Sequence, residues 1–94
     1  MAYIIHSPHF PLGKIAATPR VLEMVPKEDI QTALERHAHG DWGIMPEEDK
    51  KLNDGAVKVG DRVFSAYRSR SDIKFWIITE WDRSVTTVLL PEDY

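Results

Sequence analysis

The stretch RVFSAYRSRSDIKFWIITEWDRSVTTVLL, residues 62–90, decides the fold of this chain. Residues 63–67 alternate with a period of two, residues 75–79 form an apolar run, and residues 85–90 are rich in β-branched side chains. Short polar connections between these segments predict an antiparallel meander with residues 73–81 as its middle strand. Because the middle strand is apolar on both faces, we expect helices on one face and the N-terminal arm or a partner chain on the other.

The residues that precede the meander begin with an arm. Pro8 and Pro11 block a helix there, so residues 1–17 predict an irregular or edge-strand arm, in which residues 14–17 can pair briefly as a strand. Thr18 followed by proline is typical of a helix start and predicts a short helix over residues 19–24. The apolar side of this helix is formed by Val21, Leu22 and Val25.

Two further helices are predicted before the meander. Pro26 and the acids after it start one helix, which ends near Gly40 and carries an apolar stripe at helical spacing: Ile30, Ala33, Leu34, His37 and Ala38. Pro46 and the acids after it start another helix that runs to about residue 55. The alternation of residues 57–59 is also compatible with a strand that leads into the Gly60 turn.

Length and composition predict one domain over residues 1–94 of class α+β, with the arm, a helical part (18–57) and the meander (62–90) in this order. Its 94 residues, 43% of them hydrophobic, suffice for a single modest core. The expected core members are Leu34, Leu52, Phe64, Phe75, Ile77, Val85 and Leu89. The absence of cysteine excludes disulfides and thiolate zinc sites, which favours the cytoplasm for so small a domain.

Charge and hydropathy exclude other classes of protein. We expect neither secretion nor membrane insertion, because no stretch has the pattern of a signal peptide or approaches the roughly 18 apolar residues of a membrane span. The formal net charge of −3 argues against nucleic-acid binding unless basic side chains gather locally. Four arginines of the sheet region could form such a strip or be scattered by the alternation of the strands: Arg62, Arg68, Arg70 and Arg83.

A candidate metal site lies at the end of the helix that starts at Pro26. His37, His39 and Asp41 have the H-x-H-x-D spacing of metallo-β-lactamase-type hydrolases, whose two-sheet fold is too large for 94 residues. We favour structural roles instead, with His37 partly buried on the helix stripe, and predict no cofactor. The sequence contains no nucleotide-binding, P-loop, nucleophile-elbow or zinc-helix motif, which favours a protein that is not an enzyme.

Several separated elements resemble a known family: HGDWG (39–43), PEED (46–49), FSAYRS (64–69) and FWIITEWDRSVTTVLLPEDY (75–94). Together they are similar to a family of short bacterial proteins of plasmids, phages and integrated elements, often labelled plasmid-related protein. The resemblance covers roughly the last two thirds of the chain. It implies a mobile-element setting and supplies no catalytic residues.

The sequence therefore predicts a non-enzymatic protein-binding accessory factor of mobile elements, with inhibition of a host defence system as a candidate role. The expected contact surface combines the loop 40–45 with the turn 81–83 and contains Asp41, Trp42, Ile44, Trp81, Asp82 and Arg83. We expect Trp42 to plug the edge of the core, with an exposed anchor as the alternative, and the same choice applies to Trp81. The strand near Leu90 could also pair with its copy in a homodimer.

An alternative function is a toxin-type ribonuclease or another component of a toxin–antitoxin pair. The order of helices followed by a meander is similar in layout to the RelE/ParE toxin superfamily. Those ribonucleases are strongly basic, and this chain departs from them with its net charge of −3.

Overall fold

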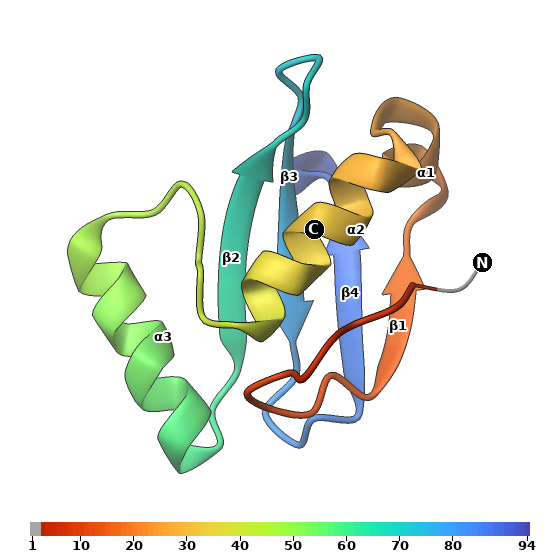
Figure 1. Ribbon diagram of the computed structural model, residues 1–94. Coiled ribbons are helices and arrows are strands. Elements are labelled where there is room, and N and C mark those ends of the chain that lie inside the picture. Colours follow the sequence, from red (N-terminus) through yellow and green to blue (C-terminus); the bar gives the residue numbers. More distant parts are fainter. Residues whose placement is uncertain (1–2) are drawn as a thin grey trace.

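The computed structural model describes residues 3–94, so the first two residues of the predicted arm lie outside it. Within this range the chain forms β1 (Lys14–Ala17), α1 (Pro19–Met24), α2 (Lys27–Ala38), α3 (Glu47–Val59), β2 (Val63–Arg68), β3 (Lys74–Thr79), β4 (Val85–Leu89) and the 3-10 turn η1 (Pro91–Asp93). The predicted α+β class and the antiparallel meander β2-β3-β4 are confirmed (Figure 1). No helix in the described range is long and apolar enough to cross a membrane.

The sheet contains a fourth strand that changes the expected edges. Its order is β1-β4-β3-β2, and β1 pairs in parallel with β4, from Lys14 opposite Val85 to Ala17 opposite Val88. A parallel neighbour needs a long connection, and here the three helices and the strands β2 and β3 lie between β1 and β4 in the chain. Because β4 lies between β1 and β3, it is not an edge of the sheet, so the expected pairing of a free edge strand near Leu90 with its copy does not fit this order. Formation of a homodimer stays a prediction.

The two N-terminal helices follow the sequence pattern. Thr18 caps α1 by accepting a hydrogen bond from the backbone N–H of Val21 at 3.4 Å. All five residues of the predicted α2 stripe are buried, and Gly40 adopts a positive φ of 80° two residues after the helix. These helices were predictable because their caps and their apolar spacing agree with each other.

The third helix is longer than predicted. It continues through Gly55 to Val59 and ends at Gly60, which takes the left-handed conformation of a C-terminal cap. The alternative strand over 57–59 and the end near residue 55 are therefore wrong. Leu52 is 71% exposed, so its predicted place in the core is also wrong.

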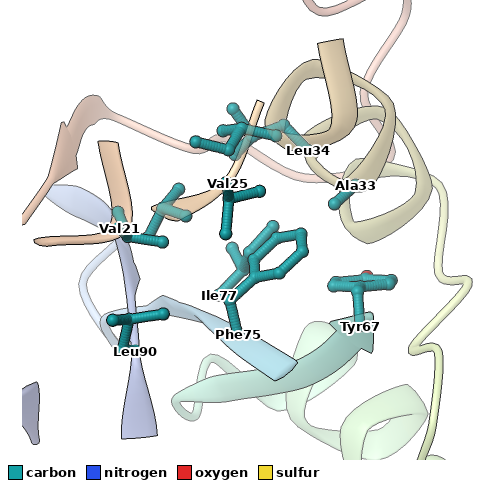
Figure 2. Close-up of a cluster of buried hydrophobic side chains, with 10 residues drawn as sticks. Val21, Val25, Ala33, Leu34, Tyr67, Phe75, Ile77 and Leu90 are labelled. Carbon is teal, nitrogen blue, oxygen red and sulfur yellow. The ribbon is translucent and has the colours of Figure 1, made fainter. Parts of the chain in front are cut away.

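The core lies between the sheet and the two N-terminal helices, on what we call the near face of the sheet. Figure 2 shows Tyr67 of β2 and Phe75 of β3 on the side of the sheet that faces Ala33 of α2. The ring centroids of Tyr67 and Phe75 are 5.9 Å apart. Of the predicted core members, Leu34, Phe75, Ile77 and Leu89 are buried. Phe64 and Val85 are half-buried and lie on the opposite side of the sheet, the far face, as Leu89 also does.

The N-terminal arm lies along α2 and leaves the far face open. Ile4 exchanges two hydrogen bonds with the side chain of Gln31, and both the backbone N–H and the ring of His6 contact Glu35. Ile4 and His6 are two residues apart on the extended arm, and their partners are four residues apart on α2. The two spacings match because an extended chain rises about twice as far per residue as a helix. The arm therefore does not cover the far face, one of the two possibilities that the sequence left open.

The outer edge of β2 is covered by the segment that leads into α3. The side-chain amide of Asn53 bonds both backbone groups of Phe64, and the backbone of Trp42 and Ile44 bonds both backbone groups of Ala66. Gly43 makes this approach possible, because a Cβ atom there would lie 2.0 Å from the carbonyl oxygen of Ala66. Helix α3 consequently stands beside β2, at the edge of the sheet (Figure 1).

Candidate partner-binding surface

The structure brings the two predicted contact segments together around one buried ring, Phe10. The ring centroids of Phe10 and Trp42 are 6.1 Å apart, and the guanidinium carbon of Arg83 lies 5.5 Å from the centroid of Phe10. Trp42 and Arg83 thus both lie against the ring of Phe10. The contacts with Phe10 hold the two segments in place. The residues of these segments that face solvent are therefore the ones that can bind a partner.

Trp42 is a plug, as expected, and is not available as an exposed anchor. Its side chain is 3% exposed, and its indole N–H donates to the carboxylate of Asp54 on α3 at 2.9 Å. The ring therefore joins α3 to the core, and its inclusion among the contact residues is corrected. On the same loop, Ile44 is 49% exposed and remains accessible.

Asp41 serves the loop itself. It accepts hydrogen bonds of 2.7 and 3.1 Å from the guanidinium of Arg36 and one of 3.3 Å from the backbone N–H of Gly43. The bond from Arg36 lowers the pKa of Asp41 below its ordinary value. A carboxylate with these partners orients the loop and is less free to pair with another protein.

Arg83 holds the turn between β3 and β4 in place. Its guanidinium donates to the backbone carbonyls of Asp61 at 2.7 Å, Ala56 at 3.0 Å and Glu80 at 3.2 Å. Its backbone has a positive φ of 60°, and Gly13 lies so close that a Cβ atom there would be 2.4 Å from the Arg83 carbonyl oxygen. Arg83 is therefore a structural residue of the turn, and its role in direct contact with a partner stays a prediction.

The same turn presents Trp81 to solvent. Trp81 is 66% exposed, so it is not a plug like Trp42. Next to it, Asp82 accepts hydrogen bonds from the hydroxyl of Ser84 at 2.7 Å and from its backbone N–H at 3.1 Å, and the hydroxyl bond lowers the pKa of Asp82. An exposed indole thus stands on a turn whose backbone is fixed from both sides.

His37 lies in a buried polar chain on the near face. Its Nδ1 is 2.6 Å from the hydroxyl of Ser65 and its Nε2 is 2.8 Å from that of Thr79. Thr79 in turn is 2.7 Å from the hydroxyl of Thr86, which donates to the backbone carbonyl of Leu12 at 2.7 Å. Burial, assisted by the positive charge of Arg83, lowers the pKa of His37 from 6.5 to about 3.

The direction of this chain follows from its last acceptor. The carbonyl of Leu12 can only accept, so Thr86 donates to it and Thr79 donates to Thr86. Thr79 must then accept from the Nε2–H of His37, which leaves Nδ1 of the neutral ring to accept from Ser65. The pair of Ser65 and His37 resembles a nucleophile with its base, yet both residues are fully buried. Its role is to satisfy polar groups beneath α2.

The candidate metal ligands do not converge. Both nitrogens of His37 are bonded to hydroxyls, and Nδ1 of His39 lies 2.7 Å from the carbonyl oxygen of Glu35. Asp41 is paired with Arg36. Within residues 3–94 no group of three histidine, cysteine or acidic side chains is arranged to hold a metal ion, and the three residues of the H-x-H-x-D spacing have other partners.

Of the two alternatives for the four arginines, the structure shows separate partners and no common strip. Arg70 makes a bidentate pair with Asp29 of α2, with its shortest N–O distance at 2.8 Å, and Arg68 pairs with Asp72 at 3.2 Å. Arg83 points to backbone carbonyls, as described above. Arg62 points instead to Tyr94, whose hydroxyl accepts a hydrogen bond of 2.8 Å from it.

Sequence reasoning missed an aromatic cluster on the far face, formed by Phe64, Trp76 and Tyr94. The ring of Trp76 lies 4.8 Å from that of Phe64 and 5.9 Å from that of Tyr94, between centroids. The signal was present in the sequence, because the middle strand is apolar on both faces and one face had no helix to cover it. The return of Tyr94 over the sheet could not be read from the pattern.

The chain matches no model of a known protein family, no curated protein and no solved structure.

Proposed function

We propose that this protein is a non-enzymatic, cytoplasmic accessory factor of mobile genetic elements that binds a protein partner through the turn bearing Trp81. The observation that carries the proposal is the 66% exposed indole of Trp81 on a turn held by Arg83. An exposed tryptophan costs free energy in water and gains it when a partner buries the ring. A fixed turn also loses little conformational entropy on binding, which favours affinity.

The charges beside the indole favour a partner with a polar rim. Asp82 and Glu80 flank Trp81 in sequence, and Ser84 holds Asp82 in one orientation. A hydrophobic anchor surrounded by charged groups is the common anatomy of a protein interface. Ile44 lies on the segment that covers the edge of β2 and is also exposed.

The mobile-element setting and the candidate role as an inhibitor of host defence come from the resemblance in the sequence. A binding factor is consistent with the buried position of the Ser65 and His37 pair, which substrate cannot reach. The resemblance in layout to RelE/ParE toxins predicts a different behaviour, namely growth arrest on expression.

The test is quantitative affinity capture from host lysate with wild-type protein, Trp81→Ala and Leu52→Ala. Leu52 is the matched control, because it is also exposed and lies on α3. We expect one partner to be retained by wild type and Leu52→Ala and lost with Trp81→Ala, and the purified pair to repeat this order in calorimetry. All three proteins should have the same melting temperature, since neither side chain is in the core.

Two results would contradict the proposal. One is a partner that Trp81→Ala retains as strongly as wild type, which would remove Trp81 from the interface. The other is growth arrest on expression in the host without any retained partner, which would favour the toxin-type ribonuclease.

A further inference from the structure

The far face of the sheet combines aromatic rings with a surface that no α-helix covers within residues 3–94. Trp76 and Phe64 are half-buried, and Tyr94 is 68% exposed. Ala16, Val85 and Thr87 continue this face across β4 and β1 and are half-buried as well. Three smaller side chains between the rings on this face are buried: Ala66, Ile78 and Leu89. The η1 turn contacts β3 and leads Tyr94 onto the sheet. The face is therefore a partly apolar surface in contact with water.

Basic side chains surround these rings. Arg62 lies over Tyr94, with its guanidinium carbon 5.6 Å from the ring centroid, and donates to its hydroxyl. The strand alternation also places Lys74 and Lys14 on this face, and both are exposed. Neither lysine is engaged in an ion pair with any described residue.

Carboxylates are sparse on the same surface. The alternation of β3 places Glu80 there, at the end of the strand. In η1, Glu92 lies 3.9 Å from Arg20, and Asp93 accepts a hydrogen bond of 2.8 Å from the hydroxyl of Thr18. These two acids are thus directed to the start of α1. The far face is locally basic although the whole chain has a net charge of −3.

We propose that the far face binds single-stranded nucleic acid, with bases stacked on Tyr94, Trp76 and Phe64 and phosphates paired with Arg62, Lys74 and Lys14. An open sheet face that carries aromatic rings beside cations fits an unpaired strand, since every base offers a flat face for stacking. In a duplex the bases are stacked on one another inside the helix, so their flat faces are not available to the aromatic side chains. This site is separate from Trp81 and goes beyond the protein-binding function.

The small number of cations determines the expected salt dependence. Three phosphate contacts on a single strand predict a slope of log K against log salt of roughly −2. Binding should therefore be weak at physiological ionic strength and readily measured at low salt. Stacking on Tyr94 should persist when salt is added, because it does not depend on released counterions.

The experiment is fluorescence anisotropy with labelled oligouridylate and oligothymidylate of about twelve nucleotides, and a duplex of the same length as comparison. We expect both single strands to bind with the slope above and the duplex to bind at least about tenfold more weakly. Tyr94→Ala should weaken single-strand binding about tenfold, as the loss of one stacked base does. This variant tests the site without touching the core, because Tyr94 is exposed.

Charge variants separate the far face from the rest of the surface. Lys74→Glu should weaken single-strand binding and make its salt slope less negative, whereas Lys51→Glu on the exposed side of α3 should leave both nearly unchanged. Equal affinity for duplex and single strand, or equal effects of the two lysine variants, would overturn the proposal. So would the absence of saturable binding at low salt. If Tyr94→Ala instead abolishes capture of a protein and no oligonucleotide binds, the face is a protein interface.

Discussion

The two faces of the sheet are built from alternate residues of the same strands, and they differ in whether their functional groups are buried or in contact with water. On the near face, Ser65, Thr79 and Thr86 form a hydrogen-bonded chain with His37 beneath α2, and all four are fully buried. On the far face, the neighbouring residues Phe64 and Trp76 and the later Tyr94 form an aromatic cluster that water reaches.

This difference separates residues that resemble a catalytic site from residues that can bind. Within residues 3–94 every buried polar side-chain atom has a hydrogen-bond partner, so the near face has no group left for a ligand. The far face keeps apolar rings and cations at the surface, where a partner can reach them. Accessibility therefore outweighs residue type as a guide to function in this molecule.

The largest test of the comparison replaces adjacent residues of β3 that point to opposite faces. Phe75→Ala should lower the free energy of unfolding by about 3 to 5 kcal/mol, because it leaves a cavity in the core beneath α2. Trp76→Ala should cost about 1 to 2 kcal/mol, although tryptophan is larger, because its ring already contacts water in the folded state. Urea unfolding followed by circular dichroism measures both values.

The outcome that would break the comparison is an equal cost for the two variants. It would mean that the far face is as well packed as the near face and is part of the core. An unchanged m-value in both variants is the control that the unfolded states are alike.

A second test uses the pH dependence that His37 gives to the near face. Its pKa is about 3 in the folded protein and has its ordinary value of 6.5 when the chain unfolds. As the pH falls below that value the unfolded state takes up a proton that the folded state does not, so stability is lost with acidification. The slope from this one group is about 1.4 kcal/mol per pH unit between the two pKa values.

His37→Leu is the matched variant for this test. It should be less stable than wild type at neutral pH by about 2 kcal/mol, since Ser65 and Thr79 lose their bonds to the ring. Its stability should change less between pH 6.5 and about 4.5, a window above the range in which the carboxylates with lowered pKa take up protons. Parallel slopes for variant and wild type would show that His37 is accessible to protons in the folded state.

Much of the fold was predictable because local signals agreed with one another. The cap at Thr18, the stripe of α2 and the period of two in the meander each determined an element from a few neighbouring residues. The extension of α3 was missed because Gly55 is a helix breaker in isolation, and the bonds that Asn53 and Trp42 make to hold the helix are distant in sequence. The parallel pairing of β1 with β4 is likewise a long-range contact.

The candidate site was less predictable, since exposure is a tertiary property. Trp42 and Trp81 have similar polar neighbours in the sequence, yet one is buried by Phe10 and Asp54 and the other is exposed. The sequence predicts that Arg83 and Asp41 contact a partner. In the structure Asp41 accepts a hydrogen bond from Arg36, and Arg83 donates one to the backbone carbonyl of Asp61. Hydrogen bonds from a side chain to a distant backbone leave no pattern that sequence reasoning can detect.

The smallest test concerns α3, which stands at the edge of the sheet and covers neither face. Gly55 lies inside this helix, is exposed, and has no atom within 4 Å of the position that a Cβ would take. Gly55→Ala should therefore raise the free energy of unfolding by about 0.5 to 1 kcal/mol, because alanine restricts the unfolded chain and favours the helix. Thermal and urea unfolding would both detect this gain. A loss of stability would instead mean that the added methyl group meets another part of the chain. The side of α3 that carries Gly55 would then be packed, and α3 would have to be included in the comparison with the two faces of the sheet.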